Sequence, residues 1–327
     1  MDIKHDARDL VEVKESTLKG LGVFAKVDIP RGTRVLAEPA LLKVDRQAVK
    51  ANDIVEAFKN LPSPQQSLYL DLHGYACDSF KRATESEMGQ NWEQIPEIQR
   101  TVLAIYKANA FGSVFSFGSR FNHSCVPNIH FAYNPAIEKE TFHAIRSITA
   151  GEELTIMYIN GTNRTRDQRQ AHLNQWGFHC ACPACEDTLD GKNKEKRRAQ
   201  LFTLDQELAL IMRLGTEKTY GKALRIAQTM AAIQKSEGLL NRELGVSYHD
   251  AARYSWKMNE PKATLCWVEK ELEVDLYCLG EDHPEYKETV KMVEILRQAA
   301  DASNPFDERI SNWFDSHGSP TDSCMLM

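Results

Sequence analysis

The chain has 327 residues, a formal net charge of −6 and a sequence pI near 6.0. This slightly acidic charge argues against electrostatic binding of nucleic acid, which needs clustered Lys and Arg. It is compatible with a basic protein partner. Hydrophobic residues make up 42% and charged residues 26% of the chain, so a sizeable core is available and wholesale disorder is disfavoured. We therefore expect one large domain or two ordinary ones.

The sequence contains no segment that predicts export or a membrane span. The N-terminus, MDIKHDARDL, lacks an apolar signal core, and no apolar run approaches about 18 residues. We expect an intracellular protein, in the nucleus, the cytoplasm or both, whose cysteines stay reduced. Cys324 begins a CMLM ending that loosely fits a farnesylation signal, although a chance match is the favoured interpretation.

The pattern of apolar residues changes twice along the first half of the chain. Residues 9–45 alternate apolar and charged positions between glycine and proline turns, which predicts short strands. Residues 46–110 favour helices separated by proline-bearing loops, and residues 111–160 return to strand-like segments. A polar helix is then expected from Thr165 to about Trp176, followed by a cluster of cysteines.

The second half of the chain has a helical pattern. The charged stretch 189–199 fits either a linker or the solvated start of a helix. Residues 200–302 repeat apolar positions at steps of three and four, which fits tetratricopeptide-like (TPR-like) helix pairs and, nearly as well, an ordinary helical bundle. Residues 303–327 are rich in Ser, Asp, Pro and Gly, so we expect a loose tail in which Trp313 and Phe314 could dock.

Three segments of the first half combine residue types that are typical of ligand-binding or catalytic sites. Residues 19–24, KGLGVF, hold two glycines that allow a close approach to a ligand, although alone they favour a hairpin turn. Residues 120–128, RFNHSCVPN, gather several donors and acceptors in front of a proline. Residues 151–158, GEELTIMY, predict a turn into a strand that ends at Tyr158, whose ordinary role is that of a buried aromatic with a satisfied hydroxyl.

A fourth segment, residues 176–185, reads WGFHCACPAC and places three thiols within six residues. Thiolates this close suit a tetrahedral Zn²⁺, which needs a fourth ligand. Cys125 is the best candidate because it lies inside the second segment, and His179 is a rival that neighbours Cys180. The other cysteines are assigned to a loop or to helical core positions: Cys77 to the loop, and Cys266 and Cys278 to the core.

In this order, the four segments resemble the SET-domain family over about residues 8–188. The helical second half and the cysteine loop are most similar to the SET-and-MYND branch of that family. Residues 45–100, where that branch inserts its MYND zinc finger, hold only His73 and Cys77 as candidate ligands. We therefore expect the finger to be absent, and the partner binding that it provides is not carried over.

The resemblance implies an α+β fold with small β-sheets, a knot-like crossing of the C-terminal strand and a helical insertion at 46–110. It also implies a post-SET zinc loop followed by an all-α, TPR-like domain. The expected organisation is a SET domain over 8–160, a post-SET zinc-binding region over 161–188, a helical domain over 200–302 and a tail over 303–327.

The resemblance also implies an S-adenosylmethionine-dependent protein-lysine N-methyltransferase, acting on a histone or another protein without binding nucleic acid directly. Tyr158 is the implied catalytic residue, with its hydroxyl beside the transferred methyl group. Cofactor contacts are implied for Gly20, Leu21, Gly22, Asn109, Asn122, His123, Trp176 and Phe178. One structural Zn²⁺ is implied on Cys125, Cys180, Cys182 and Cys185.

Two other functions compete with the enzyme. One is a catalytically silent SET-like scaffold whose helical half binds protein partners. The presence of Asn122, His123 and Tyr158 favours the enzyme over the scaffold, because a silent protein could lose all three. The other is a zinc-dependent nucleic-acid binder, against which the acidic balance and the lack of a basic helix beside the cysteines both argue.

Overall fold

The computed structural model describes residues 6–17, 19–44, 49–159, 163–301 and 307–316. The sequence features noted at Cys324 lie outside these residues. Within the described residues, seven strands form two small sheets, one ordered β1-β2-β7-β4 and the other β3-β6-β5. The strands are β1 Val11–Ser16, β2 Gly20–Ala25, β3 Arg34–Glu38, β4 Asn122–His123, β5 Ile129–Asn134, β6 Lys139–Ala144 and β7 Glu153–Ile156.

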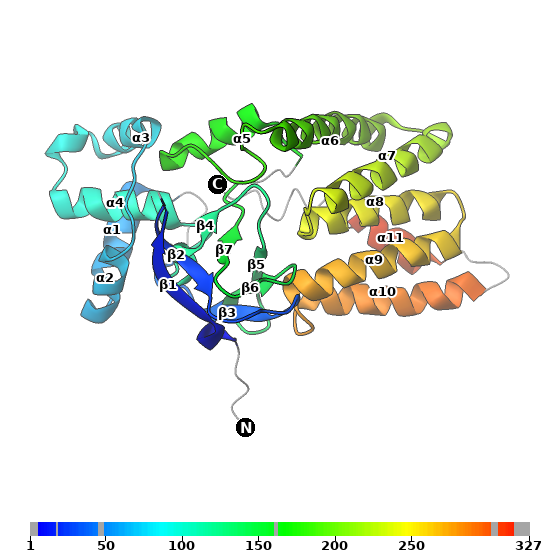
Figure 1. Cartoon of the computed structure of the whole chain (residues 1–327), viewed down its shortest axis with the longest axis horizontal. Coiled ribbons are helices and arrows are strands. Elements are labelled where there is room, and N and C mark those ends of the chain that lie inside the picture. Colours follow the sequence, from blue (N-terminus) through cyan, green and yellow to red (C-terminus); the bar gives the residue numbers. More distant parts are fainter. Residues whose placement is uncertain (1–5, 18, 45–48, 160–162, 302–306, 317–327) are drawn as a thin grey trace, which may run out of the picture.

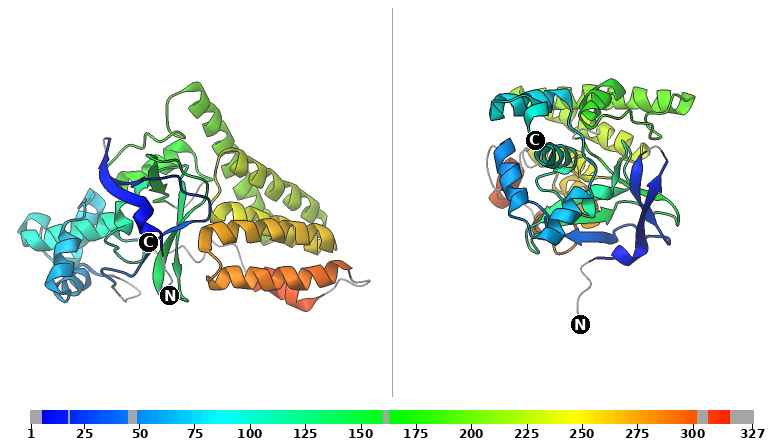
Figure 2. Two further views of the ribbon diagram at one scale, coloured as in Figure 1. Left: turned by 60° about the horizontal axis from the view of Figure 1, so that its bottom comes forward. Right: turned by 90° about the vertical axis from the view of Figure 1, so that its left-hand side faces the viewer.

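The α-helices fall into two groups on opposite sides of the sheets, as Figure 1 and the left panel of Figure 2 both show. One group interrupts the strands between β3 and β4, and the other follows β7. The helices are α1 Ala51–Lys59, α2 Ser63–Leu70, α3 Asp78–Met88, α4 Glu97–Asn109, α5 Arg166–Leu173, α6 Leu189–Leu214, α7 Glu217–Ser236, α8 Arg242–Lys257, α9 Pro261–Leu279, α10 Pro284–Asp301 and α11 Glu308–Ser316. The mixed α+β fold expected from the sequence is confirmed at this level.

The first sheet depends on a parallel pairing between strands far apart in sequence. β1 and β2 form an antiparallel hairpin, and β7 pairs antiparallel with β2. β4 then pairs parallel with β7, with Asn122 opposite Thr155 and His123 opposite Ile156. The two pairings of β7, with β2 and with β4, place three of the polar segments noted in the sequence on neighbouring strands.

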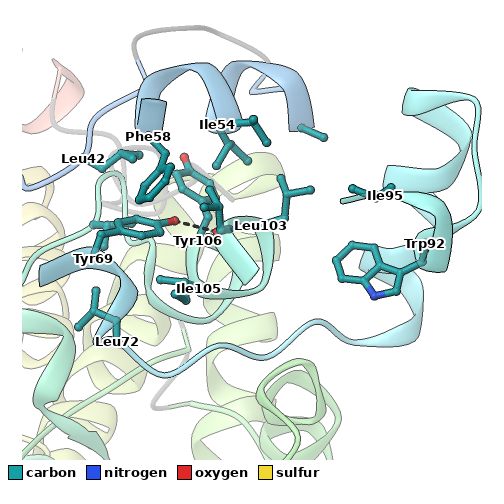
Figure 3. Packing of buried hydrophobic residues seen from close by; sticks show 14 residues of the cluster. Leu42, Ile54, Phe58, Tyr69, Leu72, Trp92, Ile95, Leu103, Ile105 and Tyr106 are labelled. Carbon is teal, nitrogen blue, oxygen red and sulfur yellow. Dashed lines mark hydrogen bonds between the residues drawn. The ribbon is translucent and has the colours of Figure 1, made fainter. Parts of the chain in front are cut away.

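The helices between β3 and β4 have their own apolar core, drawn in Figure 3. In α1 the residues Ile54, Val55 and Phe58 are buried at helical spacing, which is why this short segment folds as an amphipathic helix. The buried hydroxyl of Tyr69 in α2 donates to the carbonyl oxygen of Val102 in α4 at 2.8 Å, so its polar atom is satisfied. This core fixes α4, whose last turn lies beside the candidate site.

The helical second half is built from α6 to α11. α8 packs between α7 and α9, and α9 packs in turn against α10. Ala251 and Ala252 in α8 are fully buried, and small residues at such positions allow close helix packing. The charged stretch at 189–199 proves to be the start of a helix, since α6 begins at Leu189. None of the helices among the described residues is long and apolar enough to cross a membrane.

Two expectations from the sequence are wrong in this half. The tail is not loose throughout, because Glu308–Ser316 form α11. Ile310, Trp313 and Phe314 lie on one face of that helix and are buried against the helical core. Their spacing of three and four residues is the pattern of an amphipathic helix, which explains why this segment is helical. Cys266 was assigned to the core, but it lies on the solvent side of α9 and is exposed.

Candidate functional site

The two glycines of the first segment lie on β2 beside β7 and β4. Gly20 has φ +71°, a conformation that glycine adopts without strain. A Cβ atom on Gly22 would lie 2.6 Å from Glu153 Oε1 and 2.8 Å from Asn122 Nδ2, so no other residue fits there unless its neighbours move. Asn122 Nδ2 donates to Leu21 O at 3.1 Å and to Glu153 Oε1 at 2.8 Å. The first, second and third segments are therefore locked together by one amide group.

This arrangement leaves an acceptor on the half-buried Asn122. Both hydrogens of its amide are committed to the protein, and its oxygen accepts no hydrogen bond from the described residues. Glu153, which the sequence analysis did not single out, also pairs with Lys19 Nζ at 3.0 Å. The alternation of residues along β7 could have indicated it, because Glu153 and Thr155 both face away from the buried Leu154.

Tyr158 lies just beyond β7, where its ring meets other aromatic rings. Its hydroxyl donates to the carbonyl oxygen of Phe121 at 2.7 Å. Burial, and to a lesser extent the charge of Glu153, raises the pKa of Tyr158 above its usual range, so the hydroxyl keeps its proton at neutral pH. The ring centroids of Trp176 and Phe178 lie 5.4 Å and 6.5 Å from that of Tyr158. The structure thus brings these three predicted residues together.

Trp176 and Phe178 come to this place through the segment after α5. Trp176 Nε1 donates to Ala108 O at 2.9 Å, which ties it to the end of α4. Gly177 has φ +75°, and a Cβ there would overlap the ring of Tyr75, so a tight left-handed turn sets the two aromatic side chains apart. Tyr75 is a neighbour of the site that nothing in the sequence pattern pointed to.

His123 is buried, and both of its ring nitrogens have partners in the protein. Nδ1 accepts a hydrogen bond from the backbone N–H of Tyr158 at 3.1 Å, so the ring proton belongs on Nε2. Nε2 lies 3.3 Å from Cys125 Sγ and donates to it. Burial lowers the pKa of His123 to about 4, in keeping with a neutral ring. The ring therefore links Tyr158 to the cysteines, and only the backbone of His123 is left to face a cofactor.

Asn109 occupies the last position of α4 and is buried. Its Nδ2 donates to His73 O at 2.6 Å and to Ile105 O at 2.7 Å. One amide hydrogen therefore holds the segment before α3 against α4, and the other bonds within α4 itself. Asn109 follows Ala108, whose carbonyl oxygen receives the Trp176 hydrogen bond.

The sulfur atoms of Cys125, Cys180, Cys182 and Cys185 all lie within 4.8 Å of one another. Cys125 Sγ is 3.9 Å from Cys180 Sγ and 3.7 Å from Cys185 Sγ. A tetrahedral Zn²⁺ with Zn–S bonds of about 2.3 Å places its sulfurs about 3.8 Å apart. The spacing and the chemistry of this donor set therefore fit one zinc ion, and the four residues are the ones that the sequence suggested.

The rival ligands lie elsewhere. His179 is exposed and is not part of the cluster. Cys77 is half-buried and contacts Ser79 at 3.2 Å, while Cys278 is buried with Leu279 and Val274 in the helical core. Among the described residues, the four grouped cysteines are the only set of three or more metal-binding side chains found together.

Four thiols this close cannot all ionise without a cation. Hydrogen bonds from Cys125 and its neighbours lower the pKa of Cys182, while the pKa of Cys125 is raised because its thiol donates to the surrounding sulfurs. Zn²⁺ removes this conflict because it stabilises all four thiolates together.

Comparison with known proteins agrees with this geometry. The SET domain family matches residues 20–159. Histone-lysine N-methyltransferase set5 of Schizosaccharomyces pombe is 28% identical over 86% of this chain and 83% of its own length. A putative SET domain-containing protein, L678 of Acanthamoeba polyphaga mimivirus, is 26% identical over 59% of this chain and 84% of its own length.

Solved structures of the same class also align with the chain. A crystal structure of the SET domain of LSMT, bound to lysine and AdoHcy, covers 90% of this chain and 89% of that one, with 13% identity and a TM-score of 0.36. A score this low supports no conclusion about this chain. The match over residues 20–159 and the relatives that extend along the chain do support one. The match identifies residues 20–159 as a SET domain.

Proposed function

We propose that this chain is an S-adenosylmethionine-dependent protein-lysine N-methyltransferase. The observation that carries the proposal is the aromatic cluster of Tyr158, Trp176 and Phe178 next to Asn122, at the end of the segment matched as a SET domain. Aromatic faces attract cations, and both the sulfonium donor and the ammonium of a target lysine are cations. The relative named as a histone-lysine N-methyltransferase, which covers most of the chain, supports the same activity.

The residues beside β2 and β4 fit the cofactor. S-adenosylmethionine supplies a methyl group on a positively charged sulfur, together with an ammonium group that needs acceptors. The free amide oxygen of Asn122 is such an acceptor, and Gly20, Leu21 and Gly22 offer backbone groups beside it. His123 contributes backbone groups, while Trp176 and Phe178 form an aromatic wall for the adenine or for the lysine channel.

Tyr158 serves as the hydroxyl beside the transferred methyl group. Its proton points to Phe121 O, so the lone pairs of its oxygen remain available to the polarised C–H groups of a methyl on sulfur. The raised pKa of Tyr158 makes it a poor base at neutral pH, because the phenolate is scarcely populated. Tyr158 therefore orients the methyl group, and the lysine proton leaves by another route.

The target lysine must lose its proton before transfer. A free lysine has a pKa of about 10.4, and burial among aromatic side chains disfavours the ammonium form. The proton passes to solvent, and the neutral nitrogen attacks the methyl carbon as the carbon–sulfur bond breaks. Holding the two reacting atoms about 3 to 3.5 Å apart, in line, then supplies most of the rate enhancement.

The zinc centre is structural in this proposal. Cys125, Cys180, Cys182 and Cys185 fill all four tetrahedral positions and leave none open for substrate. The ion joins the second segment, which carries Asn122 and His123, to the post-SET loop that follows Phe178. It therefore holds the aromatic wall against the cofactor pocket.

The finer organisation follows the family. We assign a SET domain to 8–160, with the β4–β7 pairing as part of its knot-like crossing, and a post-SET zinc region to 161–188. The helical region over 200–302 is TPR-like, since α7 to α10 pack as successive neighbours. Its outer surface is assigned to a protein partner.

Histones are the first substrates to test, because the relative set5 carries that name, and non-histone proteins are the second. We assign the enzyme to the nucleus, the cytoplasm or both, since proteins of either class occur there. Direct nucleic-acid binding is not part of the proposal, given the net charge of −6.

The test is transfer of labelled methyl groups from S-adenosylmethionine to core histones and to a mixed protein extract. The proposal predicts label on lysine, identified as methyl-lysine after hydrolysis of the product. Cofactor binding without label on any lysine would instead establish a silent scaffold.

A further inference from the structure

Two arginines beside the cysteine cluster are completely buried. Arg169 in α5 and Arg198 in α6 are each 0% exposed, and they head the ranking of fully buried side chains by volume. Burying a guanidinium ion costs several kcal/mol unless negative charge and hydrogen bonds offset it. Two such ions next to one another therefore require a source of negative charge at the same place.

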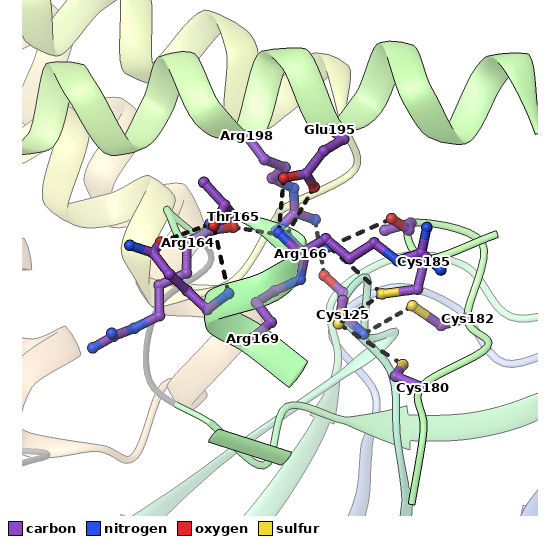
Figure 4. Close-up of polar contacts among 12 residues, drawn as sticks. Cys125, Arg164, Thr165, Arg166, Arg169, Cys180, Cys182, Cys185, Glu195 and Arg198 are labelled. Atoms are coloured by element: carbon purple, nitrogen blue, oxygen red, sulfur yellow. Dashed lines mark hydrogen bonds and ion pairs between the residues drawn. The ribbon is translucent and has the colours of Figure 1, made fainter. Parts of the chain in front are cut away.

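Arg169 reaches the cluster directly. Its Nη2 donates to Cys185 Sγ at 3.5 Å and to Ala184 O at 3.4 Å, as Figure 4 shows. Its Nη1 donates to Arg164 O at 2.7 Å. The carboxylate of Glu195 in α6 lies 3.6 Å from Nη1, is partly exposed, and is too distant to form a strong ion pair. The guanidinium thus contacts the cysteine loop, the segment just before α5, and α6 at once.

Arg198 reaches the other side of the cluster. Its Nη2 donates to the backbone oxygen of Cys125 at 2.9 Å, in the segment that also carries Asn122 and His123. Figure 4 shows Arg198 and Glu195 projecting from α6 towards the cysteines, while Arg169 comes from α5. The long helix of the second half is therefore attached to the SET domain through this contact.

The charge of a metal-loaded cluster is opposite to that of the arginines. Four thiolates and one Zn²⁺ carry a net charge of −2, and Arg169 contacts one of these sulfurs while Arg198 contacts the backbone of another ligand.

We propose that Arg169 and Arg198 are positioning residues that neutralise the zinc–thiolate cluster and fasten it to α5 and α6. This inference rests on the zinc centre of the proposed function. Because Arg169 also belongs to the helix that leads to Trp176 and Phe178, it couples metal binding to the placement of the aromatic wall. Arginine suits the task because its planar fork lets Nη2 reach the cysteine loop while Nη1 reaches Arg164 O, a spread of donors that the single ammonium of lysine lacks.

The experiment measures how fast the purified full-length protein releases Zn²⁺ to an excess of chelator carrying a colorimetric zinc indicator. Arg169→Met and Arg198→Met should each release zinc about 10- to 100-fold faster than wild type, the usual effect of losing a partner of a metal ligand. Arg166→Met is the matched control, since its side chain is exposed one turn earlier in α5 and only its backbone bonds to Glu195. It should release zinc at the wild-type rate.

A second measurement distinguishes the loss of the Arg169 hydrogen bond to Cys185 from a general loss of structure. Arg169→Lys keeps the charge and a similar volume but gives up the fork, and its far-ultraviolet circular dichroism should match wild type. In the cobalt-loaded protein, loss of the N–H···S bond should shift the sulfur-to-cobalt charge-transfer band to longer wavelength, and Arg166→Met should leave the band unchanged.

Wild-type release rates and an unshifted band in both Arg169 variants would overturn the inference. A wild-type protein that binds neither zinc nor cobalt would overturn it together with the zinc centre. The zinc-release and cobalt measurements do not depend on methyl transfer. A failure of the proposed enzymatic activity would therefore appear only in the labelling experiment.

Discussion

The Nε2 atom of His123 lies 3.3 Å from the sulfur of Cys125 and donates a hydrogen bond to it. The opposite nitrogen of the same ring accepts the backbone N–H of Tyr158. One buried imidazole therefore connects a cysteine of the metal cluster to the backbone of the proposed catalytic residue. Loss of the metal is expected to disturb the active site through this ring and through the loop that carries Phe178.

Replacing Cys182 by serine should lower the zinc content from about one ion per chain to a small fraction of that, because a hydroxyl is a poor zinc ligand at neutral pH. Cys266→Ser is the control, since that cysteine is exposed and lies outside the cluster. Elemental analysis of both purified proteins gives the answer. Full zinc content in the Cys182 variant would remove this residue from the ligand set.

Replacing Gly22 by alanine should weaken cofactor binding and lower the free energy of unfolding by about 1–3 kcal/mol, the usual cost of an overpacked site. The new methyl group would press on Glu153 and Asn122, which would then turn away from the pocket. Calorimetric titration with S-adenosylmethionine and urea unfolding measure the two effects.

The matched control for that substitution is Gly221→Ala, in the interior of α7. A Cβ there lies 3.7 Å from its nearest neighbour, and alanine is the better helix former by about 1 kcal/mol. This variant should be at least as stable as wild type and should bind the cofactor equally well. Equal behaviour of the two alanine variants would show that Gly22 is not required for close packing.

The metal cluster could be anticipated from the sequence better than its surroundings. Three cysteines within six residues must lie close together whatever the fold, so their spacing carried the information. Cys125 lies 55 residues from Cys180, so spacing could not link it to them, and it was chosen because it lies inside the polar segment 120–128. Arg169 and Arg198 could not be singled out, since a buried arginine looks like a solvated one until the packing of its helix is known.

The fold, too, was predictable where the sequence signal is local and was not predictable where strands far apart in sequence pair. Short-range signals gave the hairpin at 11–25, the helices between β3 and β4, and the helical second half. The parallel pairing of β4 with β7 is a long-range contact between two short strands, and local pattern alone did not contain it. In α11 the polar composition outweighed the buried spacing of Ile310, Trp313 and Phe314, which is why a helix was mistaken for a tail.

Glu140 provides a test of pH dependence. It lies on β6, is 6% exposed, and burial raises its pKa to about 8 from the usual 4.5. Between these two values the unfolded chain has released the proton and the folded chain still holds it, so the unfolding free energy falls as pH rises through this window. Below about pH 4.5 both states are protonated and the effect disappears.

Glu140→Gln should remove this dependence, because the amide is neutral at every pH. Its stability relative to wild type should therefore increase by about 3 kcal/mol between pH 5.5 and pH 8.0. Urea unfolding of both proteins at the two pH values provides the comparison, in which all other titrating groups cancel. A stability difference that does not change with pH would show that Glu140 is ionised in the folded protein throughout.

The turnover rate of Tyr158→Phe tests the proposed mechanism most directly, measured as methyl transfer from labelled S-adenosylmethionine to a lysine substrate. Tyr133→Phe is the control, since Tyr133 is 54% exposed on β5. Circular dichroism verifies that the Tyr158 variant folds, because the lost bond to Phe121 O costs about 1 kcal/mol. The expected result is a fall in kcat of about 100-fold or more with cofactor affinity preserved, because the methyl group loses its orientation. A Tyr158→Phe enzyme with the wild-type kcat would contradict the role given to this hydroxyl.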